Sequence, residues 1–95
     1  MNPDGEIRLT GALTAREVPG IFRESLDWKH AGLPARIDLS GLEQTDSSAV
    51  ALFLEWLSWA RADGRSMSFE RPPESLRIMA SLSQADTLLG WESEA

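Results

Sequence analysis

Strand-like and helix-like segments alternate along this sequence, and that order restricts the fold more than any other feature. Three short stretches alternate apolar and polar residues, as expected of strands with one buried face: residues 5–11, 35–41 and 66–70. Between and after them, apolar residues three and four positions apart predict helices. The predicted order is therefore β-α-β-α-β-α. Because helical crossovers join parallel strands, we expect an α/β fold with a small, largely parallel (mixed) sheet packed with helices.

The first predicted helix follows Thr14, whose hydroxyl can cap it. Glu17 stands three residues later and completes a capping-box pattern. Apolar residues at helical spacing carry this helix to about Trp28. Pro19 lies inside the stretch and removes one backbone hydrogen bond, which predicts a kink or a late start. Residues 30–34 then predict a loop.

The second strand and the helix after it form the most informative stretch, "LSGLEQTDSSAVALFLEWLSWAR" (39–61). Ile37 and Leu39 should be the buried residues of the strand. A polar loop follows, and Asp46 is a preferred type of N-cap for a helix running from about Ser47 to Ala62. Gly64 is a typical C-terminal stop.

The last third of the chain predicts one strand and one further helix. The two prolines at 72 and 73 suit the first turn of a helix, which continues through Leu76, Ile78, Met79 and Leu82. Residues 85–91 predict a short helical turn or a strand.

The helix after Asp46 is apolar on more sides than one buried face requires. A helical wheel centred on Val50 places one apolar stripe toward the core: Phe53, Leu54, Leu57 and Ala60. The opposite side then carries Ser48, Leu52, Glu55 and Trp59. One interpretation is that another element of the domain covers Leu52 and Trp59. The other, which we favour, is a partner-binding surface formed around them, because clustered exposed apolar groups mark interfaces.

Composition narrows the classes of function. Ninety-five residues predict a single domain spanning 1–95. A net charge of −6 argues against nucleic acid or an anionic membrane surface as the main partner. The chain has no cysteine and one histidine, so we expect no disulfide, no zinc–thiolate site, no metal site and no cofactor. With no apolar leader or membrane span in the pattern, we expect a cytoplasmic protein.

Catalysis is not favoured by the motifs. Ser47 or Ser48 with His30 and an aspartate would supply the residue types of a triad, but no G-x-S-x-G elbow is present. No glycine pattern of a nucleotide-binding loop occurs either. We therefore expect a protein that is not an enzyme.

Three motifs resemble those of one known family. "IDLSGLEQTDSSAVALFLEWLSWAR" is similar to the signature of STAS domains, in which a strand ends in D-L-S and leads through a D-S/T turn into a helix. "LTGALTAREVPGIF" resembles the opening of the MlaB type, the small STAS subunit of the Mla phospholipid-transport ABC complex. "SLRIMASLSQADTLLGW" is similar to the ending shared by such proteins, so the resemblance covers nearly the whole chain.

The resemblance implies roles for particular residues. Ser47 corresponds to the hydroxyl residue that is phosphorylated in anti-sigma factor antagonists and to the functionally important threonine of MlaB-type proteins. Asp46, Ser48, Leu52, Glu55 and Trp59 would form the loop and interface around it. Family members usually have glycine two positions after the hydroxyl residue, where this chain has Ala49.

Two functions follow from the resemblance. The first is a cytoplasmic subunit that docks on an ABC-transporter ATPase, and through it sits at the inner face of the cytoplasmic membrane. There it would support phospholipid transport that maintains outer-membrane lipid asymmetry. The alternative is an anti-sigma factor antagonist that binds a kinase-like anti-sigma factor and is switched by phosphorylation. The single-strand opening and the "LT…EVP" pattern favour the first.

Overall fold

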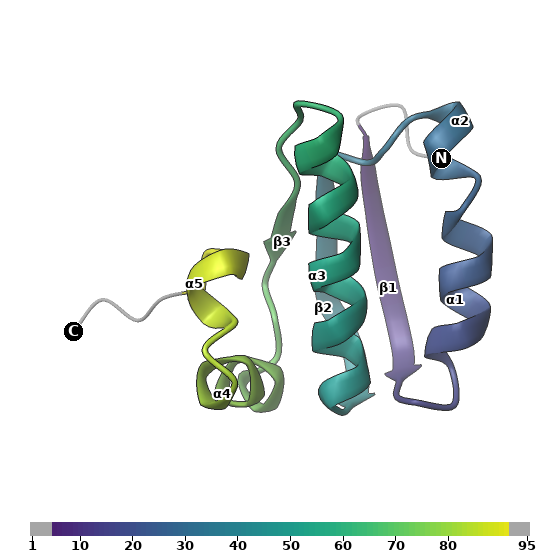
Figure 1. Ribbon diagram of the computed structural model, residues 1–95. Coiled ribbons are helices and arrows are strands. Elements are labelled where there is room, and N and C mark those ends of the chain that lie inside the picture. The colour runs from purple at the N-terminus through teal and green to yellow at the C-terminus, as the bar shows by residue number, and fades with distance from the viewer. Residues whose placement is uncertain (1–4, 92–95) are drawn as a thin grey trace.

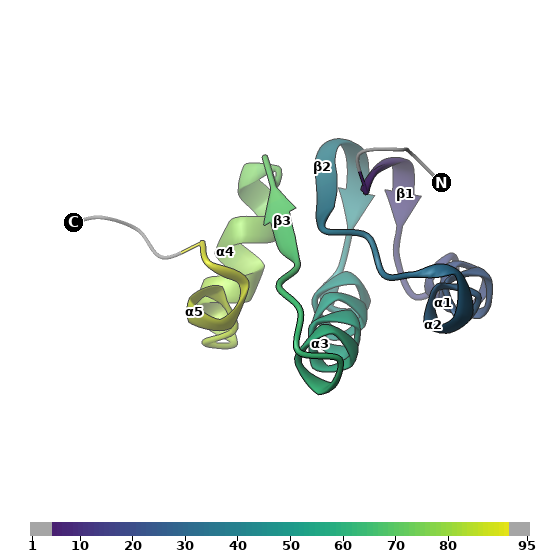
Figure 2. The same cartoon turned by 90° about the horizontal axis from the view of Figure 1, so that it is seen from above.

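A three-stranded sheet lies at the centre of the structure, a computed structural model that describes residues 5–91. The strands are β1 (Glu6–Leu13), β2 (Arg36–Thr45) and β3 (Ser68–Glu70), in the order β1-β2-β3. Both neighbouring pairs are parallel. Figures 1 and 2 show most of the helices on one side of this sheet and one helix beside its β3 edge. The predicted α/β class with a parallel sheet is confirmed. The first two strands extend further than predicted, and β3 is shorter.

Within residues 5–91, five helices connect and follow the strands: α1 (Val18–Ser25), α2 (Trp28–Ala31), α3 (Ser47–Ala62), α4 (Glu74–Leu82) and α5 (Asp86–Leu89). The long helix predicted to reach Trp28 is thus two helices. The predicted loop over residues 30–34 is wrong in its first half, because α2 continues to Ala31. Residues 85–91 were predicted to form a short helical turn or a strand, and they contain the helix α5.

The turn before α1 explains the late helix start. The Glu17 carboxylate accepts hydrogen bonds from both the backbone N–H and the hydroxyl of Thr14, at 2.9 and 2.6 Å. These contacts close a turn over residues 14–17, and the regular helix begins only at Val18. Pro19 therefore lies in the first turn, where its missing N–H costs nothing. Thr14 and Glu17 pair as predicted, but they cap this turn and not α1 itself.

Helix α3 has the predicted bounds. The Asp46 carboxylate caps its first turn, which confirms the predicted N-cap. At the other end, Gly64 has a φ of +69°, and the N–H of Arg65 bonds the carbonyl of Ala60 at 2.8 Å. This is the left-handed helix stop that favours glycine. Helix α4, in contrast, begins at Glu74, so both prolines precede it, and Pro73 is its N-cap.

The core lies between the sheet and α3. Ile37 and Leu39 of β2 are fully buried, as predicted. They meet Phe53 and Trp56, which are also fully buried. Phe53 packs against Phe69 of β3 with 5.0 Å between ring centroids. The middle strand and the middle helix therefore carry the centre of the core.

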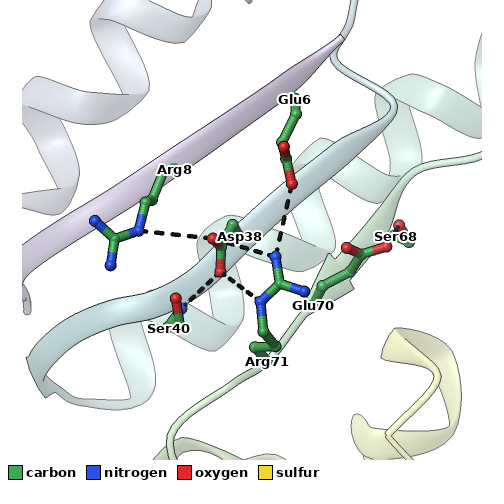
Figure 3. A network of polar contacts seen from close by, with 7 residues as sticks. All are labelled: Glu6, Arg8, Asp38, Ser40, Ser68, Glu70 and Arg71. Carbon is green, nitrogen blue, oxygen red and sulfur yellow. Dashed lines mark hydrogen bonds and ion pairs between the residues drawn. The ribbon is translucent and has the colours of Figure 1, made fainter. Parts of the chain in front are cut away.

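The other face of the sheet carries a charged network (Figure 3). The Arg71 guanidinium contacts both carboxylate oxygens of Asp38 at 3.2 Å and Glu6 at 3.7 Å, and Arg8 reaches Asp38 at 3.6 Å. Hydrogen bonds from Arg71 and from the backbone N–H of Ser40 lower the pKa of Asp38 to about 2. The network ties all three strands together on the side that the helices leave open.

Candidate functional site

The corner between β2 and α3 is organised by Asp46. Its Oδ1 accepts from the backbone N–H of Ser48 at 2.8 Å, and its Oδ2 accepts from the N–H of Ala15 at 3.0 Å. The two hydrogen bonds, the one from Ala15 foremost, lower the pKa of Asp46 below its ordinary value. Asp46 thus joins the start of α3 to the loop that follows β1. It positions the hydroxyl residues beside it.

Ser47 is the first residue of α3 and is exposed. Its hydroxyl makes no hydrogen bond to any described residue, because Asp46 already caps the turn. The start of a 16-residue helix carries a positive partial charge that favours anions nearby. Ser47 is therefore free to meet a partner or to accept a negatively charged group.

The predicted orientation of α3 is wrong. Leu52, expected on an exposed face, is only 3% exposed and belongs to the core. The side of the helix that faces the sheet is centred between Phe53 and Trp56. On a wheel with 100° per residue, this direction is about 90° from Val50, on which the predicted core stripe was centred. The solvent-exposed residues of the helix are Ser47, Ala51, Glu55, Ser58, Arg61 and Ala62.

The reason for this error is visible in Figures 1 and 2. Helix α3 lies between α1 on one side and α4 and α5 on the other, with the sheet behind it. It is covered on three sides, so its apolar residues spread around most of its circumference. The alternative that another element covers Leu52 and Trp59 is the correct one.

Trp59 belongs to the contact between α1 and α3. Its ring lies 5.6 Å from that of Phe22 on α1. Its indole N–H donates to the Glu55 carboxylate at 2.9 Å, and the Lys29 ammonium lies 4.4 Å from the ring centroid. Trp59 is half-buried by these contacts. Trp59 and Glu55 therefore stabilise the α1 side of the helix. The predicted exposure of Leu52 is wrong, whereas the roles of Glu55 and Trp59 in partner binding stay predictions.

The opposite side of α3, toward α4, is open. An apolar groove of about 260 Å³ runs along it from Ser47, and its lining residues are Ser47, Val50, Ala51, Leu54, Met79, Ser83 and Ala85. On α4, the large apolar side chain of Leu82 is 82% exposed. Ile78 is 53% exposed, but it lines a separate groove with Trp91. An uncovered apolar groove beside an exposed hydroxyl has the composition of a docking surface.

Sequence reasoning placed Val50 and Leu54 in the core and did not predict this groove. Met79 was recognised as apolar and helical, but nothing in the sequence paired it with Leu54. The sequence did contain one signal of an exposed apolar surface. Ile78 and Met79 are adjacent on α4, and two adjacent residues of a helix cannot both face the core.

Ala49 stands where the family usually has glycine, and it is fully buried. Its methyl group points into the core, away from the surface around Ser47. This departure from the family pattern therefore leaves the exposed corner unchanged.

The residue types of a catalytic triad are not brought together. Ser47 begins α3, whereas His30 lines a cleft with Ala62 and Asp63 at the other end of the same helix. A helix of 16 residues is about 24 Å long at 1.5 Å per residue. Among residues 5–91, no three histidine or acidic side chains converge as a metal site would require. None of the helices in that range has the length and hydropathy of a membrane span.

A parallel sheet with helices packed against it, and an exposed serine directly after the capping aspartate of its central helix, define a small α/β domain. The family model described as "Mlab, STAS domain" matches residues 2–90. The chain therefore belongs to the MlaB-type STAS domain family, as the sequence motifs indicated. A search of curated proteins finds no match.

Proposed function

We propose that this protein is a non-catalytic subunit that docks on the ATPase of an ABC transporter and supports its assembly and activity in phospholipid transport. Membership of the MlaB-type family supports this proposal. Through that partner it would sit at the inner face of the cytoplasmic membrane and help to maintain outer-membrane lipid asymmetry.

The observation that carries the proposal is the groove that begins at Ser47. Its lining is mostly apolar, with Leu54 on α3, Met79 on α4 and Ala85 just before α5. An apolar side chain of the partner would fill it, and Leu82 on α4 would lie within the buried area. Ser47 would then stand at the edge of the contact, where its hydroxyl can exchange hydrogen bonds with the partner.

This arrangement predicts how charge at Ser47 acts. The start of α3 tolerates a negative group in the free protein, although the Asp46 carboxylate beside it opposes one. In the complex the same charge would be desolvated against an apolar groove without a partner. A negative group at Ser47 should therefore leave the fold intact and weaken docking.

The second candidate is an anti-sigma factor antagonist, in which Ser47 would be phosphorylated. The observation that favours it is the exposure of the Ser47 hydroxyl at a helix start. A phosphate there would add about −1.5 to −2 charges. Both candidates use the same surface, and they differ in the partner.

The experiment that separates them is co-purification of the tagged protein from its own organism. We expect an ABC ATPase subunit to be retained by the wild type and lost with Leu54→Asp, which places a charge in the groove. Trp59→Ala, on the α1 side of α3 and outside the groove, is the control and should retain the ATPase. Retention of a kinase-like anti-sigma factor in place of the ATPase would establish the second candidate and reject the first.

A further inference from the structure

A second concave site lies at the opposite end of α3 from Ser47. It is a cleft of about 510 Å³ between α2, the segment after it and the end of α3, and the residues lining it are Trp28, Lys29, His30, Ala31, Gly32, Leu33, Trp59, Ala62, Asp63 and Arg65. Figure 1 shows both segments, α2 and the C-terminal end of α3, at the upper end of the molecule. Its volume is within the range of about 300–1,000 Å³ that is usual for small-molecule sites.

Two of the residues that line the cleft are tryptophans, and contacts with neighbouring side chains hold both in place. Trp28 packs on the buried Trp56 with 4.7 Å between ring centroids. Trp59 is held by Phe22 and by its hydrogen bond to Glu55. Two indole rings supported from behind in this way form a preorganised apolar surface, which reduces the entropic cost of binding a flat ring.

The charge of the cleft is opposite to that of the protein. The chain has 15 acidic and 9 basic residues. The cleft is lined by two basic side chains, Lys29 and Arg65, and one acidic side chain, Asp63. Asp63 is already paired with Nε of Arg65 at 2.8 Å. Lys29 has no carboxylate partner among residues 5–91, and its ammonium rests on the Trp59 ring.

Lys29 and His30 also occupy the last turn of α2, where cations are favoured by the helix dipole. A helix of four residues has little dipole, so that effect is a weak reason for the position of Lys29. The stacking of Lys29 on an indole at the edge of a cavity is better suited to binding an anion. There the ammonium can reach an anionic group while the ring of the ligand lies between the tryptophans.

We infer that this cleft binds a small organic anion consisting of an aromatic ring and a carboxylate, sulfonate or phosphate group. The ring lies against Trp28 and Trp59, and the anionic group pairs with Lys29, assisted by Arg65 and the ring nitrogens of His30. This inference does not depend on the function proposed for the Ser47 end. The two sites lie at opposite ends of α3, about 24 Å apart by the length of the helix.

The test uses 2-naphthalenesulfonate as the probe and the indole N–H signals of the four tryptophans as reporters in a ¹H–¹⁵N correlation spectrum. Trp28 and Trp59 line the cleft, whereas Trp91 lines a separate groove on α4. We expect the probe to shift the signals of Trp28 and Trp59 in a saturable manner and to leave that of Trp91 unchanged. The neutral analogue 2-naphthalenemethanol should bind about tenfold more weakly, because it lacks the charge that Lys29 pairs with.

Charge-reversal variants provide the matched control. Lys29→Glu should weaken binding of the sulfonate by about tenfold or more, and Lys29→Arg should retain it. Arg77→Glu changes the net charge by the same amount on exposed α4, and it should leave the affinity unchanged. Because Lys29 is exposed, each variant should keep the circular dichroism of the wild type. Lys29→Gln serves as the test if the reversal disturbs folding.

Three results would overturn the inference. The first is no shift of the Trp28 and Trp59 signals at millimolar probe. The second is a shift centred on Trp91, which would place the probe in the other groove. The third is an equal loss of affinity with Lys29→Glu and Arg77→Glu, which would show a general effect of net charge.

Discussion

The two flanks of α3 differ in how they are closed. On the α1 flank, Trp59 spans the distance to Phe22, and Leu52 is buried behind it. On the α4 flank, Leu54 faces Met79 across a groove that stays open. The same helix thus packs against α1 on one flank and leaves the other flank open, where we propose that a partner docks. Apolar residues on a helix indicate contact, and the neighbouring elements decide whether that contact is internal.

The largest loss of stability should come from a substitution on the side of α3 that faces the sheet, between the two flanks. Phe53 is fully buried against Phe69, Trp56 and Trp91. Phe53→Ala should lower the free energy of unfolding by about 3–5 kcal/mol, because it leaves a large cavity in the core. Urea denaturation measures this change. A loss as small as that of a flank residue would mean that the sheet side is not the centre of the core.

The next test compares the flanks directly. Trp59→Ala should cost about 2 kcal/mol, since it removes the aromatic pair with Phe22 and the apolar contact that closes the α1 flank. Leu54→Ala on the α4 flank should cost less, about 1 kcal/mol, because Leu54 is only partly buried and one side of it faces the open groove. The same urea titrations give both values. If Leu54→Ala were the more damaging change, the groove would be closed in solution and the comparison would fail.

The pH dependence of the melting temperature tests the contact that Asp46 makes between α3 and the loop before α1. The pKa of Asp46 in the folded protein lies below its ordinary value of 3.8 because of the hydrogen bonds from Ala15 and Ser48. A lowered folded-state pKa stabilises the protein above about pH 4, and this contribution is lost as the pH falls below that value. Asp46→Ala should therefore lower the melting temperature at pH 7 and reduce the loss seen on acidification.

The control for that experiment is Asp38→Asn, because Asp38 is a carboxyl with a lowered pKa that lies far from α3, on the other face of the sheet. Its pKa of about 2 places its own loss of stability between about pH 4 and pH 2. A melting temperature for Asp46→Ala that matches the wild type at pH 7 would show that Asp46 does not hold the start of α3.

The smallest effect on stability should come from Ser47→Ala. The hydroxyl makes no hydrogen bond to a described residue, and Asp46 supplies the cap. The free energy of unfolding should change by less than about 1 kcal/mol, as for most exposed substitutions. A larger loss would show that Ser47 is part of the cap, and its role at the groove would then be difficult to separate from folding.

The sequence predicted much of this fold because its signals are local. The cap at Asp46, the stop at Gly64 and the alternation in β2 depend on neighbouring residues, and the α3 bounds are confirmed. The break between α1 and α2 was missed because the apolar spacing continues across it.

The orientation of α3 could not be predicted for a related reason. Its apolar residues cover three sides, so a wheel has no single direction, and one centred on Val50 made Leu52 and Trp59 appear exposed. The groove depends on the distance between α3 and α4, which no local pattern contains. The roles of Asp46, Ser47 and Ser48 in binding stay predictions.

The most direct test of the account is the affinity of Ser47→Glu for the purified ABC ATPase subunit, measured by calorimetric titration. We predict a loss of about a hundredfold with an unchanged circular dichroism spectrum, because the carboxylate would be buried in the interface without a partner. Ser66→Glu adds the same charge to an exposed loop beyond the far end of α3 and should bind as the wild type does. Wild-type affinity for Ser47→Glu would place Ser47 outside the interface and contradict the proposed docking site.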